Sequence, residues 1–220
     1  MRKEVVDFIQ NQRVNAENRM YSYTKDALGK LYPQRTIFIR AKRYLTDFLQ
    51  KKEVARWLII PGLRGVGKTT LLAQLYIWLI RDTKDVNILF LSLNEVVDIL
   101  KSDLKEALDT FEYLLGESFE KQTKQTFIFL DEVQYDPSWA SILKSLYDRS
   151  RNIFIFCTGS SAISLQTSVD SIRRSSFEKL YPCSFTEFIM LSKKVYPVTG
   201  LKQQLKTALW QSQSGKEVYE

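Results

Sequence analysis

The feature that most constrains this chain of 220 residues is a glycine-rich octapeptide at residues 62–69, Gly-Leu-Arg-Gly-Val-Gly-Lys-Thr. It follows an apolar run at residues 57–60 and precedes a helical stripe of apolar residues at 71–79. Glycines at this spacing let the backbone fold so that successive N–H groups point inward, and the following helix adds the positive end of its dipole. The pattern predicts a phosphate-binding loop between a buried strand and a helix.

The side chains of this loop have separable roles in binding a nucleoside triphosphate. Lys68 is expected to reach the β and γ phosphates, and Thr69 to place its hydroxyl on Mg²⁺. Thr70 is expected to bond the neighbouring phosphate. The residues predicted to bind the nucleotide are Gly62, Leu63, Arg64, Gly65, Val66, Gly67, Lys68, Thr69 and Thr70.

Short apolar runs alternate with helical patterns through the middle of the chain. Their hydrophobicity is continuous rather than alternating, as strands covered on both faces require, so the sheet should be mainly parallel with right-handed crossovers. We therefore predict an α/β fold of the P-loop NTPase class, a three-layer sandwich around a mainly parallel five-stranded sheet. The expected strands are 57–60, 88–91, 127–130, 153–157 and 177–180, and the expected helices are 71–79, 97–115, 139–147 and 185–191.

The two ends of the chain are less clearly patterned than the middle. Residues 1–35 indicate one helix followed by a loop, and a second helix should end near residues 50–52, where basic side chains complement the helix dipole. The expected organisation is an N-terminal helical extension at 1–52, a core at 53–190, and a C-terminal tail at 191–220 that begins a lid or further domain.

Composition removes several kinds of chemistry. The chain contains no histidine, which excludes Ser-His triads, histidine general bases and histidine-ligated zinc. Its two cysteines lack the spacing of a metal or redox pair. No signal peptide or spanning segment is recognisable, so the expectation is a cytoplasmic protein without a membrane partner.

Two carboxylates follow the apolar run at residues 127–130. Asp131 is expected to hold Mg²⁺ directly or through water. Glu132 would then polarise a water molecule for attack on the γ phosphate, because no histidine is present to act as the base. A second carboxylate at this point favours hydrolysis over phosphoryl transfer to another substrate. The competing interpretation is a pair of solvated acids at a strand end.

Hydroxyl groups follow the next apolar run, at residues 158–161. The carboxyl ends of strands in open α/β sheets are where ligands collect. Thr158 or Ser160 is therefore a candidate for orienting the attacking water or contacting the γ phosphate. Simple turn chemistry is the alternative for this segment.

Together these segments resemble the prokaryotic archaeal-type ATPases of the AAA superclass, relatives of the signal-transducing STAND ATPases. The similarity covers about residues 37–190. Beyond the loop, it rests on Asp-Glu-Val-Gln at 131–134, Thr-Gly-Ser-Ser at 158–161 and Pro-x-Ser-Phe-x-Glu-Phe at 182–188.

The resemblance implies an AAA/ASCE-type sheet in which the Asp131 strand lies between the loop strand and the strand at 88–91 or its neighbours. It implies ATP and Mg²⁺ as cofactors. It also implies an arginine finger shortly before residue 182, a position that Arg173 or Arg174 would fill in cis or for a neighbouring subunit.

The chain departs from the pattern of these ATPases in two respects. They often carry a second arginine after the position of Arg64, where this chain has Gly65. They also usually continue into a helical lid and an effector module, so this chain is expected to be a fragment of a longer protein.

The sequence favours an ATP-hydrolysing switch that acts on an attached or partner protein module, with oligomerisation open. The alternative is a nucleotide-dependent binding module with negligible turnover. A kinase would need an acceptor-binding lid, and a GTPase would need an Asn-Lys-x-Asp element, which is absent here. The net charge of +7 makes DNA a further candidate partner, although the basic residues are dispersed among acidic ones.

Overall fold

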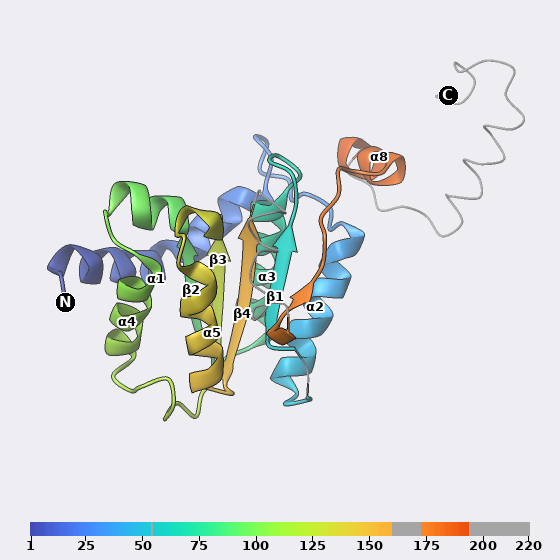
Figure 1. Ribbon diagram of the computed structural model, residues 1–220. Helices are drawn as coiled ribbons and strands as arrows, with labels where there is room; N and C mark the ends of the chain where they lie inside the picture. Colours follow the sequence, from blue (N-terminus) through green and yellow to red (C-terminus); the bar gives the residue numbers. More distant parts are fainter. Residues whose placement is uncertain (54, 160–172, 194–220) are drawn as a thin grey trace, which may run out of the picture. The chain divides into compact units, whose positions relative to one another are not determined.

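The computed structural model describes residues 1–53, 55–159 and 173–193 (Figure 1). These residues belong to two compact units, one made of Met1–Lys30 and Gln34–Pro182, the other of Leu31–Pro33 and the chain from Cys183 onward. The first unit contains the sheet and the predicted site. Of the second unit, the described part includes the helix α8, Phe185–Lys193, close to the predicted helix at 185–191.

A five-stranded sheet in the order β2-β3-β4-β1-β5 forms the centre of the first unit. Every neighbouring pair is parallel, which confirms the predicted sheet. β3 lies between β2 and β4, and β4 separates it from the loop strand β1, as the resemblance implied. The strands are β1 Trp57–Pro61, β2 Asn87–Ser92, β3 Thr126–Asp131, β4 Ile153–Gly159 and β5 Ser176–Phe177.

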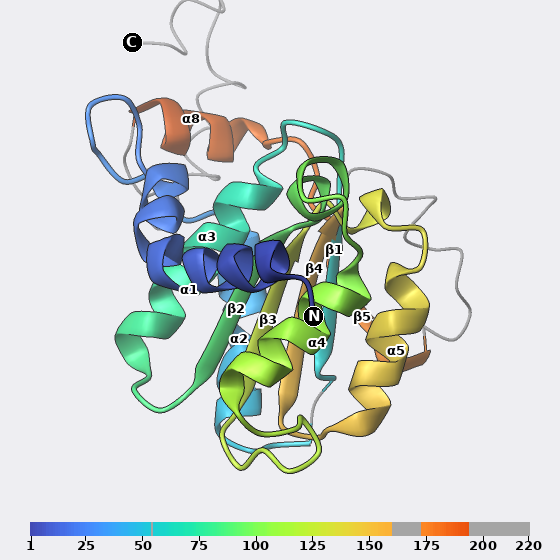
Figure 2. The same cartoon turned by 90° about the vertical axis from the view of Figure 1, so that its left-hand side faces the viewer.

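Helices cover both faces of the sheet. α2 and α3 pack on one face, and α4 and α5 pack on the other (Figures 1 and 2). Successive residues along β1 and β4 belong alternately to the two apolar clusters, which explains the continuous hydrophobic runs in the sequence. The helices are α2 Thr36–Leu49, α3 Lys68–Asp82, α4 Leu104–Leu115 and α5 Trp139–Arg149, with a short π-helix η1 Glu95–Ile99 and a 3₁₀ turn η2 Val133–Tyr135.

The N-terminal helix α1, Lys3–Thr24, crosses the β2 edge of the sheet (Figure 2). Val5 and Ile9 pack in the cluster that contains α4 and α5, whereas Ala16 and Met20 pack in the cluster that contains α2 and α3. α1 therefore helps to cover an edge strand that would otherwise present unpaired backbone groups. It also belongs to the same compact unit as the sheet.

Two stretches differ from the sequence-based prediction. The helical stretch expected at 97–115 is divided into η1 and α4, because Lys101 adopts a left-handed φ of 52° and Asp103 caps α4 by accepting a hydrogen bond from the Glu106 N–H at 2.7 Å. The fifth strand begins one residue early and is short. Its continuation forms an isolated bridge between Leu180 and Gly62.

Candidate functional site

The loop at residues 62–69 turns directly from β1 into α3, as predicted. Gly67 caps α3 with a φ of 94°, a conformation that residues with a side chain rarely adopt. Gly62 is required for another reason, since a Cβ there would lie 2.6 Å from the Leu180 carbonyl oxygen. The segment after β5 thus closes against the base of the loop, and the first turn of α3 presents its N–H groups there.

Lys68 lies in the first turn of α3 and is buried, with 4% of its surface exposed. Its ammonium group donates hydrogen bonds to the carbonyl oxygens of Gly62 at 3.1 Å and Leu63 at 3.0 Å. Its Nζ lies 4.0 Å from the Glu132 Oε1 atom. The lysine therefore spans the loop at the place where a phosphate group would need a cation.

The Asp131 carboxylate at the end of β3 is bound by two hydroxyl groups. Thr69 Oγ1 donates to its Oδ2 at 2.6 Å, and Thr158 Oγ1 on the adjacent strand β4 donates to its Oδ1. The structure thus brings the two predicted metal-binding residues, Thr69 and Asp131, into direct contact. A carboxylate oxygen beside a hydroxyl oxygen is a donor set that suits Mg²⁺ when phosphate oxygens complete the coordination.

Burial raises the pKa of the Asp131 carboxyl above its ordinary value. The hydrogen bonds from Thr158 and Thr69 and the charge of Lys68 act in the opposite direction, and the neighbouring Glu132 carboxylate acts in the same direction as burial. The site therefore holds a carboxylate whose negative charge is poorly solvated. A bound cation would relieve this cost.

Glu132 occupies the turn that follows β3, with a left-handed φ of 55°. Its backbone N–H donates to Thr158 Oγ1 at 3.3 Å, so that the Thr158 hydroxyl contacts both acidic residues. Its side chain accepts a hydrogen bond from the Gln134 amide. A strained backbone at a cluster of charged groups is typical of functional sites.

Sequence reasoning assigned no role to two residues that contact this site. Gln134 was part of the Asp-Glu-Val-Gln motif, but its contact with Glu132 depends on the turn geometry. Arg35 lies outside every motif, yet its guanidinium donates to the carbonyl oxygens of Val66 at 2.8 Å and Tyr181 at 2.9 Å. Nothing in the local sequence marks that long-range contact.

The other predicted loop residues lie around this cluster. Leu63, Arg64 and Gly65 are exposed, whereas Val66 packs against the apolar cluster of α2 and α3, and Thr70 is half-buried in the first turn of α3. Ser160 and Ser161 lie outside the described residues, as do residues 194–220 of the predicted tail.

The structure does not bring the candidate arginine finger to this cluster. Arg174 donates to Asp148 in the last turn of α5 at 2.9 Å, and Arg173 is exposed. Both precede β5 at the end of the sheet where the parallel strands begin, whereas the loop lies where β1 ends. Within this chain the two arginines therefore lie at the opposite end of the strands from Lys68. The structure does not support an arginine finger in cis.

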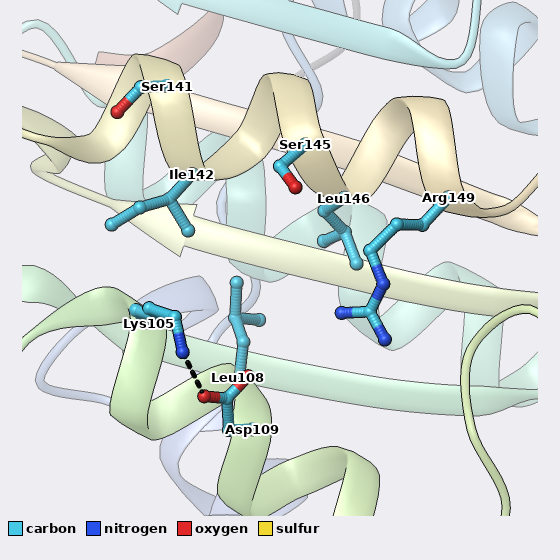
Figure 3. A pocket seen from close by; sticks show the side chains of 8 residues that line it. All are labelled: Lys105, Leu108, Asp109, Ser141, Ile142, Ser145, Leu146 and Arg149. Carbon is cyan, nitrogen blue, oxygen red and sulfur yellow. Dashed lines mark hydrogen bonds and ion pairs between the residues drawn. The ribbon is translucent and has the colours of Figure 1, made fainter.

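A separate groove of about 230 Å³ lies between α4 and α5 (Figure 3). Leu108, Ile142 and Leu146 supply apolar side chains to it. Its cations are engaged, because Lys105 pairs with Asp109 at 2.6 Å and Arg149 pairs with Glu112 at 2.8 Å. None of its lining residues belongs to the phosphate loop or the strand-end acids, so the groove is not the predicted site.

The loop after β1, the acid at the end of β3 and the interposed strand β4 define a P-loop nucleotide-binding domain of the AAA type. A family model described as an AAA domain matches residues 54–189, and the chain belongs to this family. It is 34% identical over 161 residues to an uncharacterised protein of Methanocaldococcus jannaschii, a match that covers 70% of this chain and 33% of the relative. It is 29% identical over 154 residues to an uncharacterised protein of Haemophilus influenzae, covering 69% of this chain and 37% of the relative.

Solved structures show the same fold at low identity. PCH-2 of C. elegans has a TM-score of 0.54 at 14% identity, over 93% of this chain and 64% of that one. The ORC1 protein of Aeropyrum pernix, solved with DNA, has a TM-score of 0.53 at 13% identity, over 90% and 61%. The segment matched in the curated relatives is about a third of their length. Within the described ranges, no helix is long and apolar enough to cross a bilayer.

Proposed function

We propose that this domain binds ATP with Mg²⁺ and hydrolyses it. The observation that carries the proposal is the convergence of Lys68, Thr69, Asp131 and Glu132 at one end of the sheet. Thr69 lies 2.6 Å from Asp131, and Lys68 lies 4.0 Å from Glu132. Membership of the AAA-domain family supports the same chemistry.

Each residue has a distinct task in this proposal. Lys68 and the N–H groups at the start of α3 bind the phosphates. Thr69 and Asp131 would hold Mg²⁺, which when bound supplies positive charge to the phosphate oxygens. Thr158 orients the Asp131 carboxylate and the Glu132 backbone through its two hydrogen bonds. Glu132 accepts the proton of the attacking water.

The same proposal gives the domain the role of a nucleotide switch. The segment matched in the curated relatives is about a third of their length, which supports an effect on an attached or partner protein module. Lys68 is buried at the loop and its Nζ lies 4.0 Å from the Glu132 Oε1 atom, so a triphosphate bound to Lys68 would change the surroundings of the Glu132 carboxylate. Such a change would distinguish the nucleotide-bound state from the nucleotide-free state.

Replacing Glu132 with Gln tests the catalytic part. ATP turnover should fall at least about 100-fold, because the general base is lost while phosphate and metal contacts remain. Binding of a fluorescent ATP analogue should persist. Glu117→Gln, on an exposed turn after α4, is the control and should behave as the wild type. Wild-type phosphate release from the Glu132→Gln protein would contradict the proposal.

DNA binding is a separate part of the proposal, supported only by the net charge of +7. If it occurs through phosphate neutralisation, its affinity should fall steeply as salt rises, which a fluorescence anisotropy titration of duplex DNA measures. Binding that does not respond to salt would exclude an electrostatic interface of this kind.

A further inference from the structure

The turn that carries Glu132 has a fixed position at its start. Val133, the next residue, is fully buried in the core beneath the turn. The Tyr135 N–H donates to the Glu132 carbonyl oxygen at 3.1 Å, and the Asp136 N–H donates to that of Val133 at 3.2 Å. These bonds form the 3₁₀ turn η2 and leave Gln134 at its middle.

The end of the turn is anchored as well. Asp136 is buried, with 4% of its surface exposed. Its carboxylate accepts hydrogen bonds from the Leu104 N–H and the Ser138 N–H, both at 2.8 Å. Because Leu104 is the first residue of α4, the turn is tied to a helix of the surrounding scaffold. Gln134 therefore extends from a segment that is fixed on both sides.

The two oxygens of the Glu132 carboxylate have different neighbours. Gln134 Nε2 donates to Oε2, whereas Oε1 lies 4.0 Å from the Lys68 ammonium group. An ionised carboxylate only accepts hydrogen bonds, so the amide nitrogen of Gln134 is the atom that faces it. Lys68 is also the residue that binding of a triphosphate would draw toward the phosphates.

We propose that Gln134 is a positioning residue that holds the Glu132 carboxylate in place for the attack of water. The inference rests on the proposed hydrolysis. With Lys68 bound to the phosphates, the Gln134 amide holds Oε2 in place, and Oε1, the oxygen on the side of Lys68, acts as the proton acceptor. Gln134 is neutral and cannot take the proton itself, so its effect passes through Glu132.

Two size-matched variants test the amide donor. Gln134→Leu should lower kcat about 10- to 100-fold, because a small misplacement of a catalytic group has an effect of this size. The KM for ATP and the affinity for a fluorescent ATP analogue should change less than about twofold, since no ligand contact is removed. Gln134→Glu should lose at least as much kcat, because it replaces the donor with an acceptor. The control is Tyr135→Ala at an exposed position of the same turn, which should keep wild-type kcat.

A double variant separates positioning from a structural role. If Gln134 acts through Glu132, adding Gln134→Leu to Glu132→Gln should cost no further turnover. If Gln134→Leu lowers turnover equally in the wild type and in Glu132→Gln, the inference is wrong. It is also wrong if Gln134→Leu keeps wild-type kcat while Glu132→Gln is slow. Either result leaves the proposed hydrolysis intact. Wild-type turnover in Glu132→Gln alone would overturn both.

Discussion

The sheet has one end where its parallel strands begin and another where they end, and the polar groups at these two ends have different partners. Where the strands begin, Thr126 donates to the Gln122 amide oxygen at 2.7 Å and Arg56 donates to the Ser150 carbonyl oxygen at 2.6 Å. These contacts link strand ends and connecting segments of the scaffold. Where the strands end, Lys68 and Asp131 are buried charges, and their neighbours are other polar groups of the site.

This difference indicates that a ligand binds at the end of the sheet where the strands end. Buried charges and the left-handed backbone of Glu132 oppose folding, and a chain that needed only a stable sheet would have no use for them. Where the strands begin, Thr126 and Arg56 join strand ends to connecting segments, so these polar side chains serve the fold. If the ligand binds where the strands end, substitutions there should abolish function, and substitutions where the strands begin should not.

The largest effect should follow loss of the buried lysine. Lys68→Ala should weaken ATP binding about 10- to 100-fold, because hydrogen bonds to a charged group contribute roughly 1.5–3 kcal/mol. Turnover should become undetectable. The matched control is Lys124→Ala near the start of β3, where the lysine is half-exposed beside Asp85. Equilibrium binding of a fluorescent ATP analogue measures the affinity of both variants. A similar loss of affinity in the two would show that the two ends of the sheet do not differ in ligand binding.

Replacing Asp131 with Asn should separate stability from activity. Turnover should fall about 100-fold with loss of the metal ligand, whereas the free energy of unfolding without nucleotide should not decrease. Since burial raises the pKa of Asp131, its contribution to stability is complete below the ordinary carboxyl pKa of about 3.9 and is lost as pH rises through the folded-state pKa. The Asn variant should therefore gain on the wild type from acid to neutral pH.

Urea unfolding at several pH values checks this expectation. Asp109→Asn, at a surface pair with Lys105, is the control. If the Asp131→Asn variant loses stability relative to the wild type as pH rises, the ionised Asp131 carboxylate stabilises the fold. Its burial would then not oppose folding.

A smaller effect is expected for Arg35, which joins the loop to the segment after β5. Arg35→Ala should raise the KM for ATP about 2- to 10-fold, because hydrogen bonds of about 0.5–1.5 kcal/mol to the Val66 and Tyr181 carbonyls are lost. Arg43→Ala, on the exposed side of α2, should leave KM unchanged. Equal KM values for both variants would show that the loop keeps its shape without Arg35.

The loop, the strand-end acids and the sheet were predictable because each depends on a local pattern. The α1 helix was predicted only in part, because its apolar stripe is broken by Gln12 and Arg19. Arg19 donates a hydrogen bond to the Glu95 carboxylate at 2.8 Å, and the Gln12 amide donates to the same carboxylate at 3.5 Å. These partners are about eighty residues away in the sequence, and no periodicity reports them.

The same reason explains the outcome for the arginine finger. The resemblance placed an arginine near the site by its distance from residue 182 in the sequence. In the fold, however, that arginine precedes β5 and therefore lies where the strands begin. A motif gives the order of residues along the chain. Whether a residue lies where the strands begin or where they end depends on the direction of the strand beside it.

The smallest effect should be that of Arg174→Ala. The Arg174–Asp148 pair is partly exposed, with side-chain exposures of 30% and 48%, so its loss should cost about 0.2–1 kcal/mol of unfolding free energy. Turnover per chain should be unchanged in dilute protein, because Arg174 is on the opposite edge from the loop. Measuring turnover against protein concentration extends the test to neighbouring chains. If the turnover of the variant falls further below that of the wild type as protein concentration rises, Arg174 reaches the site of another copy. The end of the sheet where the strands begin in one chain would then complete the nucleotide site of the next chain.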